Sequence, residues 1–256
     1  MESVYTFVEQ YFFVYIWLIA MGLIDTVAPV SASTITNPVT AFFTDPQRAI
    51  GISTLLFFLT SIYRVFLFKK EIFHDKHNFG VLKSMLPFTI IGAIAGGLTI
   101  SHINTNILVV IIVSISIYYI YKNINQIINN TIVEKKIGGF SSISVATLSG
   151  FFQASGMPGG DIKRGYLRTV LPEVSVRAVS YALGMFNFFI GGSIIFLSNK
   201  LPTSDLIFIV TILPPAVLAL KYGKLILEKI SDRNAKILAT ALSIIGVVLL
   251  TYKYLL

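Results

Sequence analysis

Long apolar segments separated by short polar stretches make up most of the chain. They cover residues 11–24, 26–43, 49–68, 84–101, 105–121, 140–156, 159–172, 178–198, 205–220 and 235–252. Many approach the ~20 residues with which a helix crosses a hydrocarbon core of about 30 Å at ~1.5 Å per residue. A membrane-spanning segment must be a helix or part of a closed barrel, and the alternating pattern of barrel strands is not found. The pattern predicts an all-α polytopic integral membrane protein, with residues 1–256 forming a single transmembrane domain.

The composition agrees with this prediction. Hydrophobic residues make up 55% of the chain and charged residues 12%, and the mean hydropathy is +0.79. Soluble domains carry about 25% charged residues. The net charge of +8 does not indicate nucleic acid, because the lysines cluster between apolar segments, where the positive-inside rule expects them. With no cysteine in the sequence, disulfides, thiolate metal sites and cysteine nucleophiles are excluded. We expect no metal and no cofactor.

The amino-terminal region does not resemble a secretory signal. The first basic residue is Arg48, so the basic region that begins such a signal is missing. We therefore expect the first apolar segment to stay in the mature protein.

Short matches recur at nearly one spacing and indicate an internal repeat. The matches at a spacing of 129 residues are Arg48-Ala49 with Arg177-Ala178, Pro29 with Pro158 and Phe57 with Phe186. Those at a spacing of 127 residues are Leu86-Pro87 with Leu213-Pro214 and Gly96 with Gly223. We expect one repeat over about 11–123 and a second over about 138–256, joined by a linker at 122–137.

The basic loops exchange places between the two repeats. In the first repeat the loop after 49–68 carries four lysines and the next loop none, whereas the second repeat has one lysine at 200 and five basic residues over 221–236. If basic loops face the cytoplasm, equivalent helices cross in opposite directions. An inverted repeat needs an odd number of crossings, which three transmembrane helices and one broken or re-entrant segment supply. Parallel repeats of four crossings are the alternative.

The segments expected to break are the two interrupted by glycine and proline, 22–38 and 150–167. Irregular backbone at membrane depth is tolerated where it is buried in protein or lines a cavity. Interrupted segments at matching positions of inverted halves are typical of a transporter binding site. We expect the substrate to bind between the two breaks near the bilayer midplane.

The second break carries residues suited to a small anion. The proline and two glycines at 158–160 disfavour helix, by roughly 3 and 1 kcal/mol per residue relative to alanine, and can leave N–H groups open at a half-helix start. Asp161 is a candidate proton carrier or a partner of the neighbouring cations. In the alternative interpretation, Lys163 and Arg164 lie in a cytoplasmic interfacial loop and mark topology. The expected substrate-binding residues of this break are Gln153, Ser155, Gly156, Pro158, Gly159, Gly160, Lys163 and Arg164.

The first break has hydroxyl and amide side chains where the second has glycines. These groups can donate hydrogen bonds to an anion or to helix carbonyls that the break leaves open. Asp25 is a second candidate proton carrier, with N-capping of the returning half-helix as its alternative role. The expected substrate-binding residues of this break are Pro29, Ser31, Ser33, Thr34 and Asn37.

Further polar and small residues have mainly structural interpretations. Arg48 and Arg177 begin equivalent helices, as topology residues that snorkel to the interface or as members of gating ion pairs. Asn187 is expected to bond between helices. Gly92 and Gly96 form a small-xxx-small pair, which is typical of a helix-packing surface.

These residues resemble the TauE/SafE family of membrane permeases, also described as sulfite or sulfonate exporters. The family opens each half with a glycine-rich segment followed by a "P-x-x-R-A-x-x-x-S" stretch. "GFFQASGMPGG" (150–160) and "PEVSVRAVSYAL" (172–183) match these elements, "DPQRAIGISTLL" (45–56) is the first-half equivalent of the latter, and "LPFTIIGAIAGG" (86–97) matches the third helix. The chain departs from the family where Ser and Ala at 31–33 replace the glycine run and where Pro158 and Asp161 flank the second glycine pair, which leaves the ligand open.

The resemblance implies a small-anion permease rather than an enzyme. We expect a secondary transporter that exports small sulfur-containing anions such as sulfite or sulfonates by alternating access, with proton coupling through Asp25 and Asp161. A passive anion channel and an intramembrane enzyme acting on a phosphorylated lipid are the alternatives. The expected location is the cell membrane and the expected partners are the anion and lipid. The oligomeric state is left open, a homodimer included.

Overall fold

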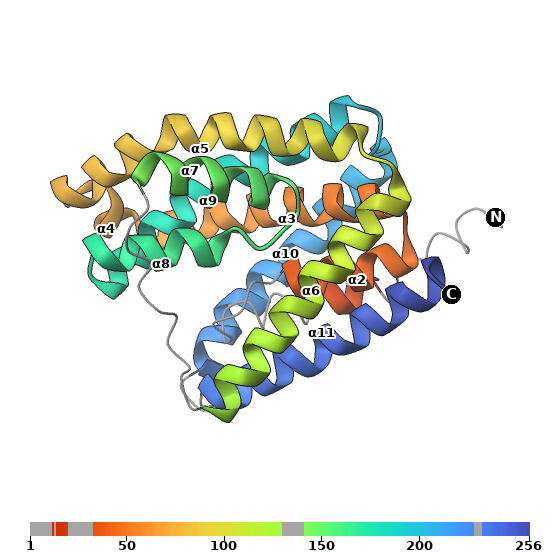
Figure 1. Cartoon of the computed structure of the whole chain (residues 1–256). Coiled ribbons are helices and arrows are strands. Elements are labelled where there is room, and N and C mark those ends of the chain that lie inside the picture. The colour runs from red at the N-terminus through yellow and green to blue at the C-terminus, as the bar shows by residue number, and fades with distance from the viewer. Residues whose placement is uncertain (1–11, 13, 20–32, 130–140, 228–231) are drawn as a thin grey trace. The chain divides into compact units, whose positions relative to one another are not determined.

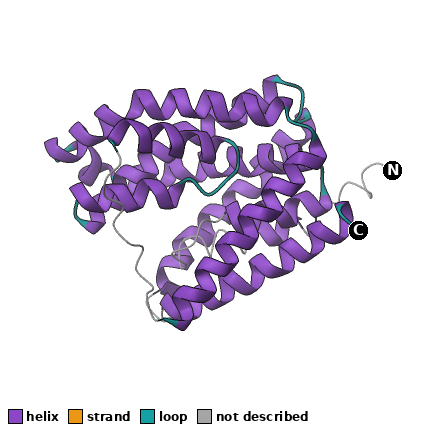
Figure 2. Ribbon diagram, in the orientation of Figure 1, coloured by secondary structure: helices purple, strands orange, loops and turns teal. Residues whose placement is uncertain are grey.

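The computed structural model describes residues 12, 14–19, 33–129, 141–227 and 232–256. Every regular element among them is a helix, which confirms the all-α prediction (Figure 2). The named helices are α2 (Ser33–Phe43), α3 (Pro46–Leu67), α4 (Lys69–Phe73), α5 (Lys76–His102), α6 (Thr105–Ile128), α7 (Ser142–Ala154), α8 (Gly160–Val170), α9 (Glu173–Leu197), α10 (Thr203–Leu227) and α11 (Asp232–Tyr254).

Six of the described helices are long and apolar enough to cross a membrane. They are α3, α5 and α6 from the first half of the sequence, and α9, α10 and α11 from the second half. The same helices expose large apolar side chains. On α5, for example, Ile91, Ile94 and Leu98 are between 43% and 57% exposed along one face, as expected of a surface that contacts lipid. The chain is a polytopic membrane protein.

The polar stretch 69–83 is largely helical. It contains α4 and the first turns of α5. Asp75 starts α5, because its carboxylate accepts hydrogen bonds from the backbone N–H groups of His77 (2.8 Å) and Asn78 (3.2 Å). The helix therefore begins eight residues before the apolar segment 84–101.

The helices form two compact units, each built from discontinuous parts of the chain. The first unit comprises Met1–Ala49, Asn104–Ile132 and Thr203–Leu256, and the second comprises Ile50–Ile103 and Val133–Pro202. In the first unit α2 packs against α6 and α11. In the second unit α5 packs against α7 and α9, and α8 packs against α7 and α9 (Figure 1).

The contact between α5 and α7 depends on glycines in both helices. A Cβ atom added at Gly92 would lie 2.0 Å from the Thr147 carbonyl oxygen, and one at Gly96 would lie 2.2 Å from that of Phe151. In the opposite direction, a Cβ at Gly150 would lie 2.2 Å from a backbone oxygen of α5. The backbones touch, as at small-xxx-small crossings. The expected packing role of Gly92 and Gly96 is confirmed.

Apolar side chains complete the core of the second unit. They come from α4, α5, α7, α8 and α9, so the short α7–α8 hairpin is packed inside this unit. The buried members are Ile72, Leu82, Met85, Val145, Ala146, Leu167, Leu171, Val176, Ala178, Val179, Ala182 and Leu183.

We expect Gly96→Ala to destabilise the protein. The added methyl group meets a backbone oxygen, which cannot move without shifting α7, and overpacking of this kind costs about 1–3 kcal/mol. The measurement is the thermal unfolding midpoint of the purified protein in detergent.

Gly80→Ala is the matched control in the same helix. Position 80 has nothing within 4 Å of the added Cβ, so this variant gains helix propensity, about 1 kcal/mol, without a clash. Equal midpoints for the two variants would contradict the packing role of Gly96.

Candidate functional site

The second predicted break is a helical hairpin. α7 has 13 residues and α8 has 11, so at ~1.5 Å per residue each is shorter than the ~30 Å hydrocarbon core. Figure 1 shows α8 returning alongside α7. In the turn between them, Gly156 has φ 71°, a conformation that glycine adopts without strain. The Ser155 hydroxyl donates to the Phe151 carbonyl at 2.7 Å and so satisfies the end of α7.

Backbone contacts hold the end of α7 on two sides. A Cβ at Gly96 of α5 would lie 2.8 Å from the Ser155 Oγ, and a Cβ at Gly191 of α9 would lie 2.7 Å from the Ala154 carbonyl oxygen. Gln153 directly precedes this clamped pair. Its position is therefore set by the packing of the second unit.

Lys163 of α8 is fully buried and lies at the centre of a polar cluster. Its ammonium Nζ donates one hydrogen bond to Gln153 Oε1 and another to the Ser180 carbonyl of α9, both at 2.9 Å. Asn187 of α9, also fully buried, donates from Nδ2 to the same Gln153 oxygen at 2.7 Å. The cluster therefore joins the three helices of the hairpin region.

The acceptors of Lys163 carry no charge. One is an amide oxygen and the other is a backbone oxygen. The acid in the next turn, Asp161, is ion-paired with Arg164 at 2.7 Å, through side chains that are 11% and 25% exposed. Burying an ammonium costs several kcal/mol unless an opposite charge compensates it. The cluster therefore holds a buried positive charge that these acceptors satisfy by hydrogen bonding but do not neutralise.

Two glycines leave room beside these donors. A Cβ at Gly184 would lie 3.6 Å from Lys163 Nζ and 3.9 Å from Gln153 Nε2. A Cβ at Gly160 would lie 3.5 Å from Gln153 Nε2 and 3.7 Å from Arg164 Nη1. These are ordinary van der Waals distances, so packing does not require glycine at either position. Hydrogen-bond donors of three side chains border this space, as an oxyanion would need.

The structure thus brings together the main predicted residues of the second break. Gln153, Gly160, Lys163 and Arg164 form the cluster and its edge, whereas Ser155, Gly156, Pro158 and Gly159 form the end of α7 and the turn. Asp161 contacts Arg164, the partner-of-cations alternative from the sequence. Asn187, expected to bond between helices, does so.

The first predicted break is described in part. Asp25, Pro29 and Ser31 lie outside the described residues, and Thr34 is described by its backbone, within α2. The buried polar face of α2 consists of Ser33, Thr36, Asn37, Thr40 and, just after the helix, Thr44. In the described part of the chain, the hydroxyl groups of Thr36 and Thr40 have no hydrogen-bond partner. The two predicted residues Ser33 and Asn37 share this face, which belongs to the first unit.

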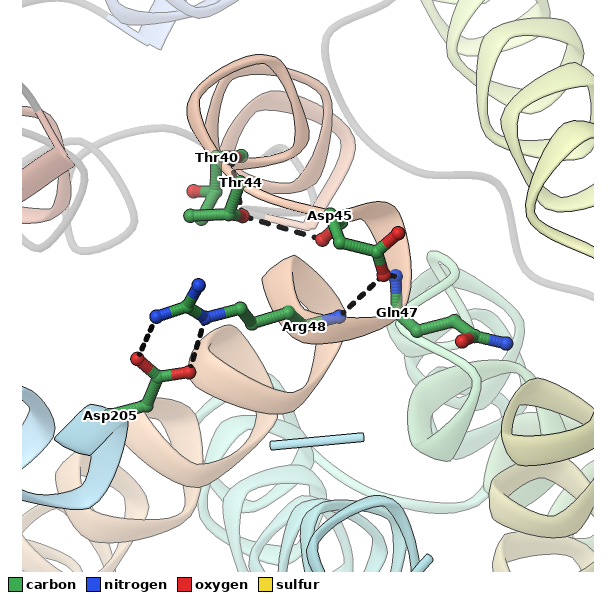
Figure 3. Close-up of polar contacts among 6 residues, drawn as sticks. All are labelled: Thr40, Thr44, Asp45, Gln47, Arg48 and Asp205. Carbon is green, nitrogen blue, oxygen red and sulfur yellow. Dashed lines mark hydrogen bonds and ion pairs between the residues drawn. The ribbon is translucent and has the colours of Figure 1, made fainter. Parts of the chain in front are cut away.

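Arg48 contacts an acid that was not singled out from the sequence. Its Nε and Nη2 donate to the two carboxylate oxygens of Asp205 at 2.6 and 2.7 Å (Figure 3). The Asp205 side chain is fully buried and that of Arg48 is 24% exposed. Asp45 accepts from the backbone N–H of Arg48 at 3.4 Å and from that of Gln47 at 2.9 Å. Arg48 is therefore held by a bidentate ion pair within the first unit.

A hydrogen bond in the second unit joins the same positions of the equivalent helices. Arg48 and Asp205 are the third residues of α3 and α10. Ser175 and Asn78 are the third residues of α9 and α5, and Asn78 Nδ2 donates to Ser175 Oγ at 2.9 Å. Arg177, the sequence equivalent of Arg48, has an exposed side chain.

One comparison with known proteins finds a match. A family model described as "Sulfite exporter TauE/SafE" matches residues 14–250, nearly the whole chain. No curated protein and no solved structure matches.

We expect Asp205→Leu to destabilise the protein strongly. It leaves the Arg48 guanidinium without its buried carboxylate, and breaking a buried pair costs about 3–5 kcal/mol, at the lower end here because Arg48 is partly exposed. The double variant Arg48→Met with Asp205→Leu leaves no unpaired charge and should recover much of this loss. The unfolding free energies of the two single variants and the double variant test this. Additive effects would contradict a direct pair.

Proposed function

We propose that this chain, which belongs to the TauE/SafE sulfite exporter family, is a secondary transporter that moves a small sulfur oxyanion or sulfonate across the membrane. The six candidate spans and the family establish a multi-pass membrane protein of a transporter family. The specific substrate class is inferred from the Lys163 cluster.

The observation that carries this proposal is the buried ammonium of Lys163. An ammonium that served stability would be expected to bind a carboxylate, since the burial cost is otherwise left uncompensated. An arriving anion can supply the missing negative charge. The low-dielectric surroundings strengthen that attraction relative to water.

The space beside Gly160 and Gly184 supports a small ligand rich in acceptors. Lys163, Gln153 and Arg164 present donors there. Gly160 is also the first residue of α8, an 11-residue helix whose amino-terminal N–H groups and dipole favour negative charge. A sulfite or sulfonate group has three oxygens that can accept hydrogen bonds from several directions at once.

The crossed contacts of Arg48–Asp205 and Asn78–Ser175 support a two-repeat architecture. In each contact the helix after a break in one repeat meets the third helix of the other repeat, at the third residue of both. A pair of equivalent repeats generates such a contact twice. Alternating access by movement of one repeat against the other is the mechanism that inverted repeats use.

We expect Lys163→Met to abolish saturable sulfite transport while the protein still folds. Methionine matches the apolar stem and removes the buried charge, a change that is often neutral or stabilising for the fold. Sulfite flux into liposomes containing the purified protein should fall at least tenfold, since an anion–cation contact of about 1.5–3 kcal/mol is lost.

Lys83→Met is the control for the loss of one positive charge, because Lys83 is exposed on α5. Its flux should match that of the wild type. Retained flux in Lys163→Met would contradict the site. Flux of the wild type that does not saturate with sulfite would indicate a channel.

Gly184→Ala tests the space beside the ammonium. The methyl group makes no contact with Lys163 Nζ or Phe188 below 3.6 Å, so the thermal unfolding midpoint should hold or rise with the gain in helix propensity. Sulfite binding should weaken at least tenfold, because the methyl group occupies the place of the anion. Unchanged binding, measured by calorimetry, would move the site away from Gly184.

A further inference from the structure

The neighbours of Gln153 determine which end of its amide faces which way. An ammonium group has donors only, so the Gln153 atom 2.9 Å from Lys163 Nζ must be the oxygen. The group of Asn187 that lies 2.7 Å from this oxygen must then be its Nδ2 amide. Two donors converge on one oxygen. Gln153 Nε2 consequently points away from them, to the space beside Gly160 and Gly184.

Asn187 lies on the face of α9 that meets the hairpin. Ser180, Gly184 and Asn187 follow a spacing of four and three residues, so they share one face of the helix. The first gives its carbonyl to Lys163, the second leaves the space, and the third donates to Gln153. The whole cluster is therefore read by a single face of α9.

The arrangement carries a cost in stability. With Nδ2 of Asn187 directed at Gln153, its Oδ1 is buried without a hydrogen-bond partner in the described part of the chain. An unpartnered buried acceptor costs about 1–3 kcal/mol. An apolar side chain at this position would avoid that cost, so the amide is better explained by its effect on Gln153 than by fold stability.

We propose that Asn187 is a positioning residue that fixes the Gln153 amide with Nε2 toward the anion, so that the site presents hydrogen-bond donors only. This inference rests on the proposed function and specifies its ligand. A site of donors favours an anion whose oxygens are all acceptors, such as a fully deprotonated sulfur oxyanion or a sulfonate group. It disfavours a ligand that presents a hydroxyl or ammonium group at the same point, because that group would meet another donor.

A double-mutant cycle distinguishes positioning from a structural role. The full-length protein carries Gln153→Leu, Asn187→Leu or both, and sulfite affinity and unfolding midpoint are measured for each. Asn187→Leu should weaken sulfite binding about tenfold, the value of one hydrogen bond to a charged group, without lowering the midpoint. In the Gln153→Leu background it should change the affinity no further. Equal losses of affinity in both backgrounds, or a lowered midpoint with unchanged affinity, would overturn the proposal.

Gln153→Glu is the second test and keeps the side-chain shape. A carboxylate still accepts from Lys163 and Asn187, so the variant should fold with an unchanged or higher midpoint. It replaces the outward donor by an acceptor and neutralises the ammonium, and sulfite affinity should fall more than tenfold. Sulfite affinity equal to that of the wild type would overturn the proposal. A wild-type protein that binds neither sulfite nor methanesulfonate would refute the transport proposal itself, and this inference with it.

Discussion

A buried ammonium bonded to two uncharged oxygens is the interaction around which the second unit is arranged. Lys163 joins α8 to the end of α7 and to α9, and it does so without a carboxylate partner among its hydrogen bonds. Two amides, a backbone carbonyl and two glycines surround the group. Each of these features has a reason if the charge is kept for a ligand, whereas a buried lysine offers little to a fold that could use an apolar side chain instead.

Close backbone packing gives this cluster its geometry. Gly92, Gly96 and Gly150 let α5 and α7 touch, and Gly191 brings α9 against Ala154. The amide of Gln153 is therefore placed by helix packing rather than by a flexible loop. Binding sites need such fixed donors, because each donor that must be ordered on binding reduces the affinity. The glycines thus divide into those that fit helices together and the two, at 160 and 184, that leave room for a ligand.

The sequence was sufficient for the helices, the second break and the members of its cluster, because hydropathy and helix-breaking residues are local signals. The proline and glycines at 158–160 mark the turn, and Lys163 follows within one helical turn of it. The Asp205 partner of Arg48 could not be identified in this way, since 157 residues separate the two. An acid at the very start of an apolar segment, matched to an arginine at the start of another, was the one available signal. The direction of the Gln153 amide likewise depends on Asn187, which sits 34 residues away on another helix.

The most direct test of the account is to locate the anion itself. Anomalous diffraction from crystals of the protein soaked with selenite, a heavier analogue of sulfite, would give the position of the selenium atom. The account predicts a peak beside Gly160 and Gly184, with selenite oxygens within hydrogen-bond distance of Lys163 Nζ and Gln153 Nε2. A well-occupied peak elsewhere, with the Lys163 cluster unchanged and closed, would contradict it.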